Sequence, residues 1–450
     1  MKINYSRSIR FLLFIILCMS ISCKNDKKIV FSNHDVAIKW SEMAIFITQF
    51  TPANTPTYAS RCFGYIGLTQ YESIVEGFAG YNSIAGALNG LGELPKPKED
   101  ETYSWALSLN AGQAYILKKI YNQTSDENKL KIDSLEQLIY ESFEEEVKDK
   151  KMIQQSVDYG REIAEIIFEW SKTDGGHRGY LNNFDKNFKH DQSPGSWVPP
   201  LYSQSISHFP LHPYWGENRV FLKINAELPN PEMIPYDTDK DSPYYLEFLE
   251  VYHKEKVLTK KEKEAAIWWG DDPDVSFTPP GHSYYISTMA LKGKNASMIV
   301  CAETYAKVGV AVADAFICCW KWKYHFFSER PNTFIPQFID EEWHSFWPDP
   351  PFPCFPSGHA IQASTAATVL ENIHGKTFKF TDSSNVGRLR DEFRDTDFVV
   401  RSFDSFWAAA QETADSRFYG GIHTAQDNIV GLEEGRKIAQ NVNNLNWKTK

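Results

Sequence analysis

Apolar side chains recur at helical spacing along most of this 450-residue chain. Two stripes with a period near 3.6 residues consist of Trp105, Leu109, Ile116 and Ile120, and of Ile153, Val157, Ala164 and Ile167. Runs that alternate polar and apolar residues are too short to indicate strands, and no segment repeats at a fixed spacing. The sequence therefore predicts an all-α fold, a helical bundle with these stripes as core faces.

A proline- and aromatic-rich stretch divides the helical pattern. The pattern extends from about residue 34 to 172, fails between 175 and 235, and resumes near 242 with breaks at 272–280 and 348–356. Eight of the 23 prolines lie between Pro194 and Pro235, among aromatic residues that would not remain in a free linker. We expect an N-terminal helical half at 34–180, an ordered connection at 181–241 and a C-terminal helical half at 242–450.

The first 23 residues have the layout of a secretory signal. Basic residues precede an apolar run at 11–21 that is too short to span a bilayer. The run ends in a sequence that resembles a bacterial lipobox, in which Cys23 would be lipidated; an ordinary cleaved signal is the alternative. We expect an exported protein with a linker at 24–33, either secreted or a cell-envelope lipoprotein, periplasmic or outer-membrane associated, that meets a membrane only through its lipid.

The net charge and the cysteine content argue against a nucleic-acid binder and against a fold held together by disulfides. The formal net charge is −11, with 47 basic and 58 acidic residues, so a general nucleic-acid binder is not expected. Beyond the signal the cysteines are odd in number and lack metal-site spacing: Cys62, Cys301, Cys318, Cys319 and Cys354. We expect buried thiols, and whether Cys354 forms a disulfide stays open.

Three short segments in the last third of the chain contain the residues that stand out. They are Lys323 with Arg330-Pro331, then Pro356-Ser357-Gly358-His359, then Ser416-Arg417 with His423 and Asp427. Each has a simple explanation when taken alone: charges near a helix C-terminus, a helix N-cap, and a surface pair at i and i+4.

Taken together, the segments predict a site for an oxyanion. Lys323, Arg330 and Arg417 supply three positive charges, and guanidinium groups bind oxyanions bidentately. Ser357 and the Gly358 N–H fall at a predicted helix N-terminus, where unpaired donors and the helix dipole favour an anion. These groups would converge on one bound anion.

Two histidines complete the candidate site. A glycine pair at 420–421 breaks the chain before His423, and Asp427 lies one helical turn later, where it can hold the imidazole tautomer. His359 follows the anion-binding turn directly and is suited to proton transfer near neutral pH.

The motifs K-x6-R-P, P-S-G-H and S-R-x5-H-x3-D, in this order, resemble the signature of the superfamily that joins vanadium-dependent haloperoxidases to type 2 phosphatidic acid phosphatases. Residues 195–199, 213–216 and 278–282 also look like segments of bacterial vanadium-haloperoxidase-like proteins, so the likeness extends from about residue 40 to the C-terminus. The resemblance implies two four-helix-bundle-like halves joined by long connections.

By this resemblance, His423 is the axial ligand of a vanadate cofactor, for which phosphate would compete, and His359 is the acid–base residue that assists peroxide binding. The remaining vanadate oxygens would be held by Lys323, Arg330, Ser357, Gly358 and Arg417. In the phosphatase branch His423 would instead attack phosphorus while His359 protonates the leaving group. The motif alone does not separate the two branches.

Features outside the motif favour the haloperoxidase branch. Membrane-type phosphatases of the superfamily carry spanning helices, for which this sequence has no apolar stretch of sufficient length. The soluble acid phosphatases of the superfamily are much shorter than this chain. Trp320 and Phe352 match positions where chloro- and iodoperoxidases carry Trp and Phe, so they are candidates for a halide pocket, with core packing as an equal alternative.

The resulting hypothesis is an exported haloperoxidase that converts a halide and hydrogen peroxide to hypohalous acid, with iodide or bromide favoured over chloride. A small organic acceptor is a further candidate partner. No haem, flavin or nucleotide motif occurs. The alternatives are a phosphatase with His423 as nucleophile and a non-catalytic helical surface lipoprotein with a relict anion pocket, and the oligomeric state stays open.

Overall fold

The computed structural model describes residues 30–190, 192–273 and 275–449, and from Phe31 onward the chain forms one compact unit. The expected signal peptide and the lipidation of Cys23 lie outside the described residues. None of the helices in the described part of the chain has the length and apolar character that a membrane crossing requires.

The N-terminal half is a group of long helices, most of which begin at a side chain that caps their free N–H groups. Ser32, Thr55, Ser125 and Asp149 each accept a hydrogen bond from the first turn of the helix that follows. The helices are α2 (Asn33–Gln49), α3 (Pro56–Glu72), α4 (Trp105–Ile120), α5 (Asp126–Val147) and α6 (Lys150–Ser171), with 3₁₀ turns η1 (Val75–Gly77) and η2 (Ala85–Ala87) between α3 and α4.

The C-terminal half is also helical, and its described residues contain one small antiparallel pair of strands. The connection contributes η3 (Gly179–Leu181), η4 (Trp215–Glu217) and α7 (Lys223–Ala226). After it come α8 (Pro243–Glu255), α9 (Lys260–Trp268), α10 (Thr278–Lys294), α11 (Met298–Phe326), α12 (Pro331–Phe338), α13 (Gly358–His374), β1 (Phe380–Asp382), β2 (Arg401–Phe403), α14 (Phe406–Tyr419) and α15 (Ala425–Asn443). The prediction of an all-α fold is confirmed.

The predicted helical pattern was wrong over one segment. Residues 73–104 contain only short 3₁₀ turns, because Gly80, Gly90 and Gly92 adopt positive φ and end any regular helix there. The break expected at 272–280 is present between α9 and α10, and its last residues, Pro279 and Pro280, occupy the first turn of α10, where a missing N–H costs nothing.

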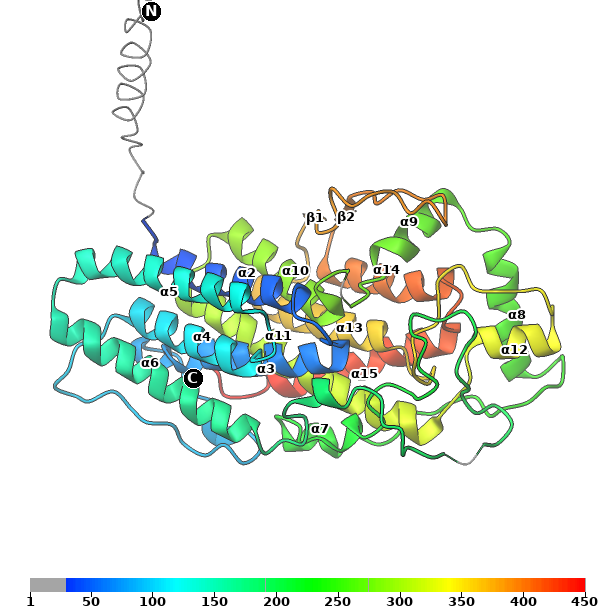
Figure 1. Ribbon diagram of the computed structural model, residues 1–450, viewed down its shortest axis with the longest axis horizontal. Helices are drawn as coiled ribbons and strands as arrows, with labels where there is room; N and C mark the ends of the chain where they lie inside the picture. The colour runs from blue at the N-terminus through cyan, green and yellow to red at the C-terminus, as the bar shows by residue number, and fades with distance from the viewer. Residues whose placement is uncertain (1–29, 191, 274, 450) are drawn as a thin grey trace, which may run out of the picture. The chain divides into compact units, whose positions relative to one another are not determined.

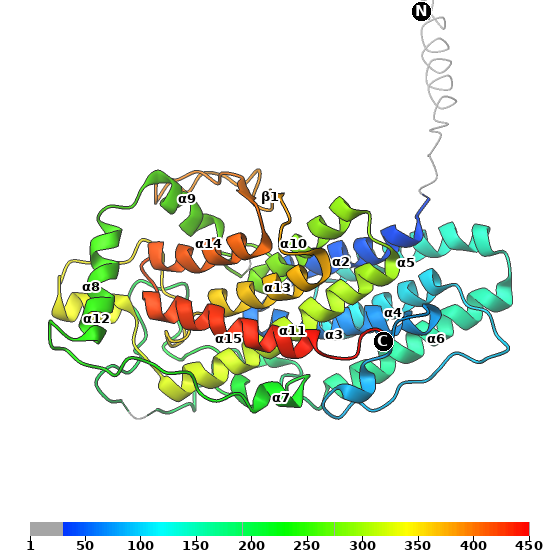
Figure 2. The same ribbon diagram turned by 180° about the vertical axis from the view of Figure 1, so that it is seen from behind.

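The longest helix, α11, joins the two halves. It packs against α3 on one side and against α13 and α15 on another, as Figure 1 and the reverse view in Figure 2 show. The α3–α11 contact requires glycine on both helices: a Cβ built on Gly67 would lie 2.4 Å from the Tyr305 carbonyl oxygen, and one on Gly309 would lie 2.4 Å from that of Phe63. This close packing fixes the C-terminal end of α11, where Lys323 lies.

The proline-rich connection packs over the C-terminal half. The Trp197 N–H donates to the Phe327 carbonyl at 2.7 Å, and the Leu211 N–H donates to the Pro351 carbonyl at 2.7 Å. Leu211 and Trp215 are both buried. The connection therefore covers the segment between α12 and α13, which forms one wall of the site described next.

Candidate active site

Lys323 and Arg330 are buried at the end of α11 and the start of α12. Lys323 is 0% exposed and its Nζ donates to the carbonyls of Pro353, at 2.8 Å, and Cys354, at 2.5 Å. Arg330 is 1% exposed and donates to the carbonyls of Phe352 and Ile422 at 2.9 and 2.8 Å. Neither residue is therefore a surface charge that only complements a helix C-terminus.

Arg417 enters the same site from the last turn of α14. It is buried, its Nη1 donates to the Trp269 carbonyl at 3.0 Å, and its Nε has no hydrogen-bond partner among the described residues. Burial, together with the neighbouring Arg330, lowers the pKa of Arg417 to about 10.

Ser357 and Gly358 form the N-terminus of α13. The Ser357 hydroxyl accepts from the Ala360 N–H at 3.4 Å, so Ser357 is the N-cap, and its own N–H donates to the Asp427 carbonyl at 3.0 Å. A Cβ built on Gly358 would lie 3.8 Å from the Trp320 ring and 3.9 Å from Lys323 Cε. The helix N-terminus therefore lies beside the lysine, as the oxyanion interpretation requires.

His423 and Asp427 form a buried pair at the start of α15. Nδ1 of His423 donates to Oδ2 of Asp427 at 3.1 Å, and Oδ2 also accepts from the Thr424 N–H at 2.9 Å. Burial lowers the pKa of His423 to about 3, so the ring is neutral at pH 7. With the proton held on Nδ1, the Nε2 lone pair is available to coordinate a metal centre or to attack phosphorus.

His359 lies in the first turn of α13 and also lines the site. Burial, followed by the positive charge of Arg417, holds the pKa of His359 well below its usual range, and the Gly270 carbonyl hydrogen-bonds to the ring. Its Nε2 is buried and has no partner among the described residues. A neutral imidazole with an unpartnered ring nitrogen can accept a proton from a bound reactant.

The three cations are buried without a described carboxylate at ion-pair distance, although Asp271 and Asp272 lie close enough to Arg417 to favour its charge. Within the described ranges of the chain, Lys323, Arg330 and Arg417 form no ion pair with a carboxylate. Burial, with Arg330 nearby, lowers the pKa of Lys323 to about 8. Burying an ion without an ion-pair partner costs several kcal/mol, so a bound oxyanion would offset a desolvation penalty that the protein's own carboxylates leave in place. The donor set fits vanadate or phosphate.

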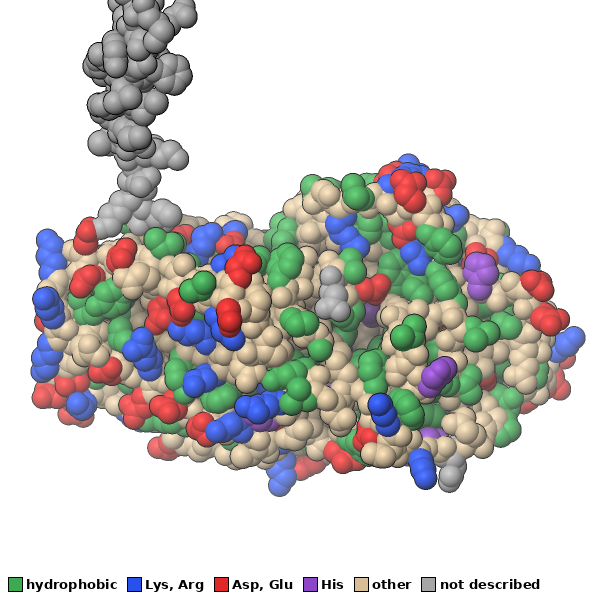
Figure 3. Space-filling view, in the orientation of Figure 1, with side chains coloured by type: hydrophobic (Ala, Val, Ile, Leu, Met, Phe, Trp, Pro, Cys, Tyr) green, Lys and Arg blue, Asp and Glu red, His purple; other side chains and the backbone are tan. Residues whose placement is uncertain are grey.

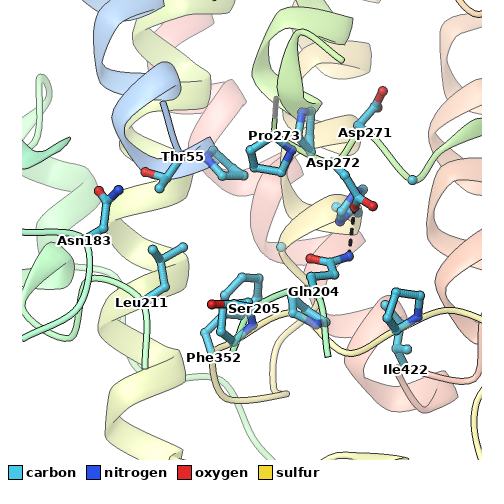
Figure 4. A pocket seen from close by; sticks show the side chains of 18 of the residues that line it. Thr55, Asn183, Gln204, Ser205, Leu211, Asp271, Asp272, Pro273, Phe352 and Ile422 are labelled. Carbon is cyan, nitrogen blue, oxygen red and sulfur yellow. Dashed lines mark hydrogen bonds between the residues drawn. The ribbon is translucent and has the colours of Figure 1, made fainter. Parts of the chain in front are cut away.

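A cavity of about 400 Å³ reaches the site. Its inner end is lined by Gly358, His359, Arg417 and His423, while Lys323, Arg330 and Ser357 lie in the wall behind. The remainder is largely apolar and extends outward to Thr55 of the N-terminal half and Asn183 of the connection (Figure 4).

The two candidate halide-pocket residues both line this cavity. The ring centroids of Trp320 and Phe352 are 4.9 Å apart. Trp320 is fixed by a hydrogen bond from its Nε1 to the Leu211 carbonyl at 3.1 Å. These rings therefore contact whatever occupies the cavity, in addition to packing against the core.

Sequence reasoning missed Cys354 as a site residue. Its thiol lies 3.0 Å from Asp427 Oδ2 and 3.3 Å from His423 Nδ1, and it is a free, buried cysteine, as are the other four outside the signal. No spacing rule connects Cys354 to residues about 70 positions later. The expectation of buried thiols is confirmed for the described residues.

A second group that sequence reasoning missed supports the loop between α9 and α10. His282 bonds Asp271 through Nδ1 and Asp382 through Nε2, both at 2.8 Å, and its ring stacks on Trp269. The two carboxylates raise the pKa of His282 to about 10 against the effect of burial, so the ring is an imidazolium. This pairing holds the loop whose carbonyls contact Arg417 and His359. The signal available in sequence was the pair of aspartates at 271–272.

Comparisons with known proteins agree on one group of relatives. A family model described as the VCPO second helical-bundle domain matches residues 303–448, which include every residue of the predicted oxyanion site. The vanadium chloroperoxidase of Curvularia inaequalis is 25% identical over a match that covers 33% of this chain. That match spans 34% of the relative's own length.

Solved structures extend the similarity to the whole fold. The crystal structure of a bacterial vanadium-dependent iodoperoxidase superimposes with a TM-score of 0.77 at 30% identity, covering 94% of this chain and 99% of that one. A holo-type bacterial vanadium-dependent chloroperoxidase superimposes with a TM-score of 0.65 at 14% identity, covering 94% of each chain, which shows a shared fold.

Proposed function

We propose that this chain, which belongs to the vanadium-dependent haloperoxidase family, oxidises a halide with hydrogen peroxide and releases hypohalous acid. The observation that carries the proposal is the meeting of three buried, unpaired cations with a neutral histidine whose Nε2 is free to coordinate. This arrangement suits a cofactor that is both an oxyanion and a metal centre.

The chain's own residues would hold vanadate in defined roles. Lys323, Arg330 and Arg417 would bind its oxygens together with the N-terminus of α13, and His423 would coordinate vanadium through Nε2. When bound, vanadate supplies a Lewis-acidic centre that activates peroxide without a change in the oxidation state of vanadium. Asp427 keeps the His423 proton on Nδ1 throughout.

His359 would move the proton. Its unpartnered Nε2 would accept a proton from incoming hydrogen peroxide and return it to the oxygen that leaves as water. The net reaction is halide plus hydrogen peroxide plus a proton, giving hypohalous acid and water.

Aromatic walls favour a large halide. Trp320 and Phe352 offer polarisable rings and few hydrogen-bond donors, which compensate poorly for the lost hydration of chloride. Iodide and bromide lose less hydration on entry, so we propose these as substrates. The relative with 30% identity is described as an iodoperoxidase.

A phosphatase is the second candidate, because the His423–Asp427 pair is also what a histidine nucleophile needs. There His423 Nε2 would attack phosphorus and His359 would protonate the leaving group. The same three cations would hold the phosphate oxygens.

Export is a further proposal. The layout of residues 1–23 supports a cleaved signal, and the sequence before Cys23 supports a lipid anchor to the cell envelope. Mass spectrometry of the mature N-terminus tests both.

One experiment separates the two candidate activities. Purified protein is freed of oxyanions and assayed, with and without orthovanadate, for peroxide-dependent iodide oxidation and for hydrolysis of a phenyl phosphate ester. We expect vanadate to switch on iodide oxidation. Phosphate-ester turnover that vanadate inhibits, with no iodide oxidation, would instead assign the phosphatase.

A further inference from the structure

One buried carboxylate in the wall of the oxyanion site has no role in the proposed reaction. Asp349 lies in the segment before α13, between Pro348 and Pro350, which both line the cavity. Its own side chain is turned to the interior and is 0% exposed. Neither Oδ1 nor Oδ2 has a hydrogen-bond partner among the residues that the structure describes. Burying a carboxylate without donors is costly, so its presence here requires an explanation.

The buried carboxylate of Asp314 on α11 shows how such a group is usually stabilised. Asp314 is also 0% exposed, but it accepts hydrogen bonds from two backbone N–H groups and from the Asn225 amide. On the face of the molecule in Figure 3, acidic side chains lie at the surface with basic side chains among them, where water screens their charge. Asp349 has neither hydrogen-bond donors nor solvent, so it acts on its neighbours mainly through its charge.

The charged group that acts on Asp349 is Arg330. Its positive charge favours the ionised form of the carboxylate. In the described part of the chain the two do not form an ion pair, because the guanidinium is held by the carbonyls of Phe352, Pro353 and Ile422. Asp349 therefore lies behind the arginine without competing for its hydrogen bonds.

No second charge among the described residues balances Asp349. The Asn332 amide also favours the ionised form, but it is engaged by Ser345, to which its Nδ2 donates at 2.7 Å. On the other side, the Tyr202 carbonyl and the Gln204 N–H both pair with the backbone of residue 349. Burial is therefore the largest influence, and it raises the pKa of Asp349 to about 7.

A bound oxyanion would change this balance. Its negative charge would lie against Arg330, so that the anion and an ionised Asp349 would share one guanidinium in a poorly screened interior. Two negative charges in such surroundings disfavour each other's ionised form. Protonation of Asp349 removes the repulsion.

We propose that Asp349 is the internal counter-ion of Arg330: it is ionised in the oxyanion-free protein and takes up a proton from solution when the oxyanion binds. The proposal rests on the oxyanion site of the proposed function and holds for either candidate activity. Asp349 acts through Arg330, so it is a positioning residue and not a catalytic one. It makes oxyanion affinity fall as pH rises, because binding then requires a proton that the free protein has lost.

The first measurement is the affinity of vanadate-free protein for inorganic phosphate, by isothermal titration calorimetry near pH 6 and near pH 8. Asp349→Asn removes the charge and keeps the shape. It should bind phosphate as tightly as the wild type near pH 6, where Asp349 is mostly protonated, and about 10-fold more tightly near pH 8. The ionisation of phosphate and of Lys323 affects both proteins alike. Equal affinities near pH 8 would overturn the proposal.

Asp340→Asn is the matched control. Asp340 follows α12 and pairs with Lys256 at 3.5 Å near the surface, away from the oxyanion site. This variant should bind phosphate as the wild type does at both pH values. A gain in affinity as large as that of Asp349→Asn would show that any lost carboxylate has this effect, which would contradict a specific role for Asp349.

The second measurement counts the proton. Titrations near pH 8 in Tris and in Hepes, which differ in their heats of ionisation, should show that the wild type takes up about one proton more than Asp349→Asn. Infrared difference spectra of the wild type should gain the C=O band of a protonated carboxyl group on phosphate binding. The same proton count in both proteins would contradict the proposal. Asp349→Ala serves the same comparisons if the asparagine variant does not fold.

The outcomes separate this proposal from the proposed function. Failure of the wild-type protein to bind phosphate would contradict the oxyanion site itself, and with it both proposals. Binding of phosphate with the same affinity, pH dependence and proton count in the wild type and in the Asp349 variants would contradict only the role of Asp349.

Discussion

Asp427 Oδ2 accepts the Nδ1 hydrogen of His423 across 3.1 Å, with both side chains buried. The carboxylate sits in the first turn of α15, where it also caps the helix through the Thr424 N–H. One residue thus fixes both the helix start and the tautomer of the histidine. The orientation of the His423 imidazole is therefore determined by the way α15 begins.

The first prediction concerns this pair. Asp427→Ala removes the group that orients His423, so vanadate affinity should fall by about 10- to 100-fold without being lost. Equilibrium dialysis with vanadium analysis measures it. Asp415→Ala, which changes an aspartate on α14 outside the site, is the control. An unchanged affinity in the Asp427 variant would show that the hydrogen bond does not position the ligand.

The second prediction distinguishes the role of Arg417, which binds the oxyanion through its charge, from that of His359, which transfers a proton. Arg417→Ala should weaken vanadate binding, because a charge-assisted hydrogen bond contributes about 1.5 to 3 kcal/mol. His359→Ala should retain most of its vanadium but turn over about 10²- to 10⁴-fold more slowly. Vanadium content and iodide oxidation are measured on the same preparations. Equal loss of metal and rate in the His359 variant would assign that residue to binding.

The third prediction is a pH dependence of stability. The pKa of His282 is raised to about 10 between Asp271 and Asp382, against about 6.5 in an unfolded chain. Because the folded pKa is the higher one, the contribution of His282 to stability is complete below pH 6.5 and is lost as pH rises through 10.

The measurement compares urea unfolding of the wild type with that of His282→Gln. The difference in free energy of unfolding should be largest near pH 6 and shrink between pH 7 and 10. A difference that is constant over this range would show that His282 is not an imidazolium in the folded protein.

The fourth prediction tests the contact between α3 and α11. Gly67→Ala and Gly309→Ala each place a methyl group 2.4 Å from a backbone oxygen, so the helices must separate, at a cost of about 1 to 3 kcal/mol. Gly293→Ala is the control, because its Cβ would meet only the Phe378 ring at 3.5 Å. Thermal unfolding should show lower midpoints for the first two variants. Equal midpoints in all three would contradict the packing described.

The sequence predicted the parts of the fold and site that depend on local spacing. The i and i+4 relation of His423 and Asp427, the N-cap at Ser357 and the position of Lys323 at a helix end are all visible in short stretches of chain. The stripes at Trp105 and Ile153 lie on α4 and α6 as predicted.

Long-range contacts through the backbone were not predictable in this way. The carbonyls that bind Lys323 and Arg330 come from the segment before α13, and any residue type could supply them. Cys354 reaches Asp427 only because two helices meet, and Gln204 reaches Asp272 across the cavity. The helical prediction for residues 73–104 failed although Ile84 and Leu88 are buried four residues apart, because burial at this spacing does not require an α-helix.

The central proposal is that His423 would hold vanadate by coordinating the vanadium through Nε2 in a working haloperoxidase. The most direct measurement is the vanadium content of wild-type and His423→Ala protein after incubation with orthovanadate and desalting, together with peroxide-dependent iodide oxidation on the same samples. The account predicts stoichiometric vanadium and activity in the wild type and neither in the variant, because charge contacts do not replace a coordinate bond. Full vanadium content in His423→Ala would contradict it.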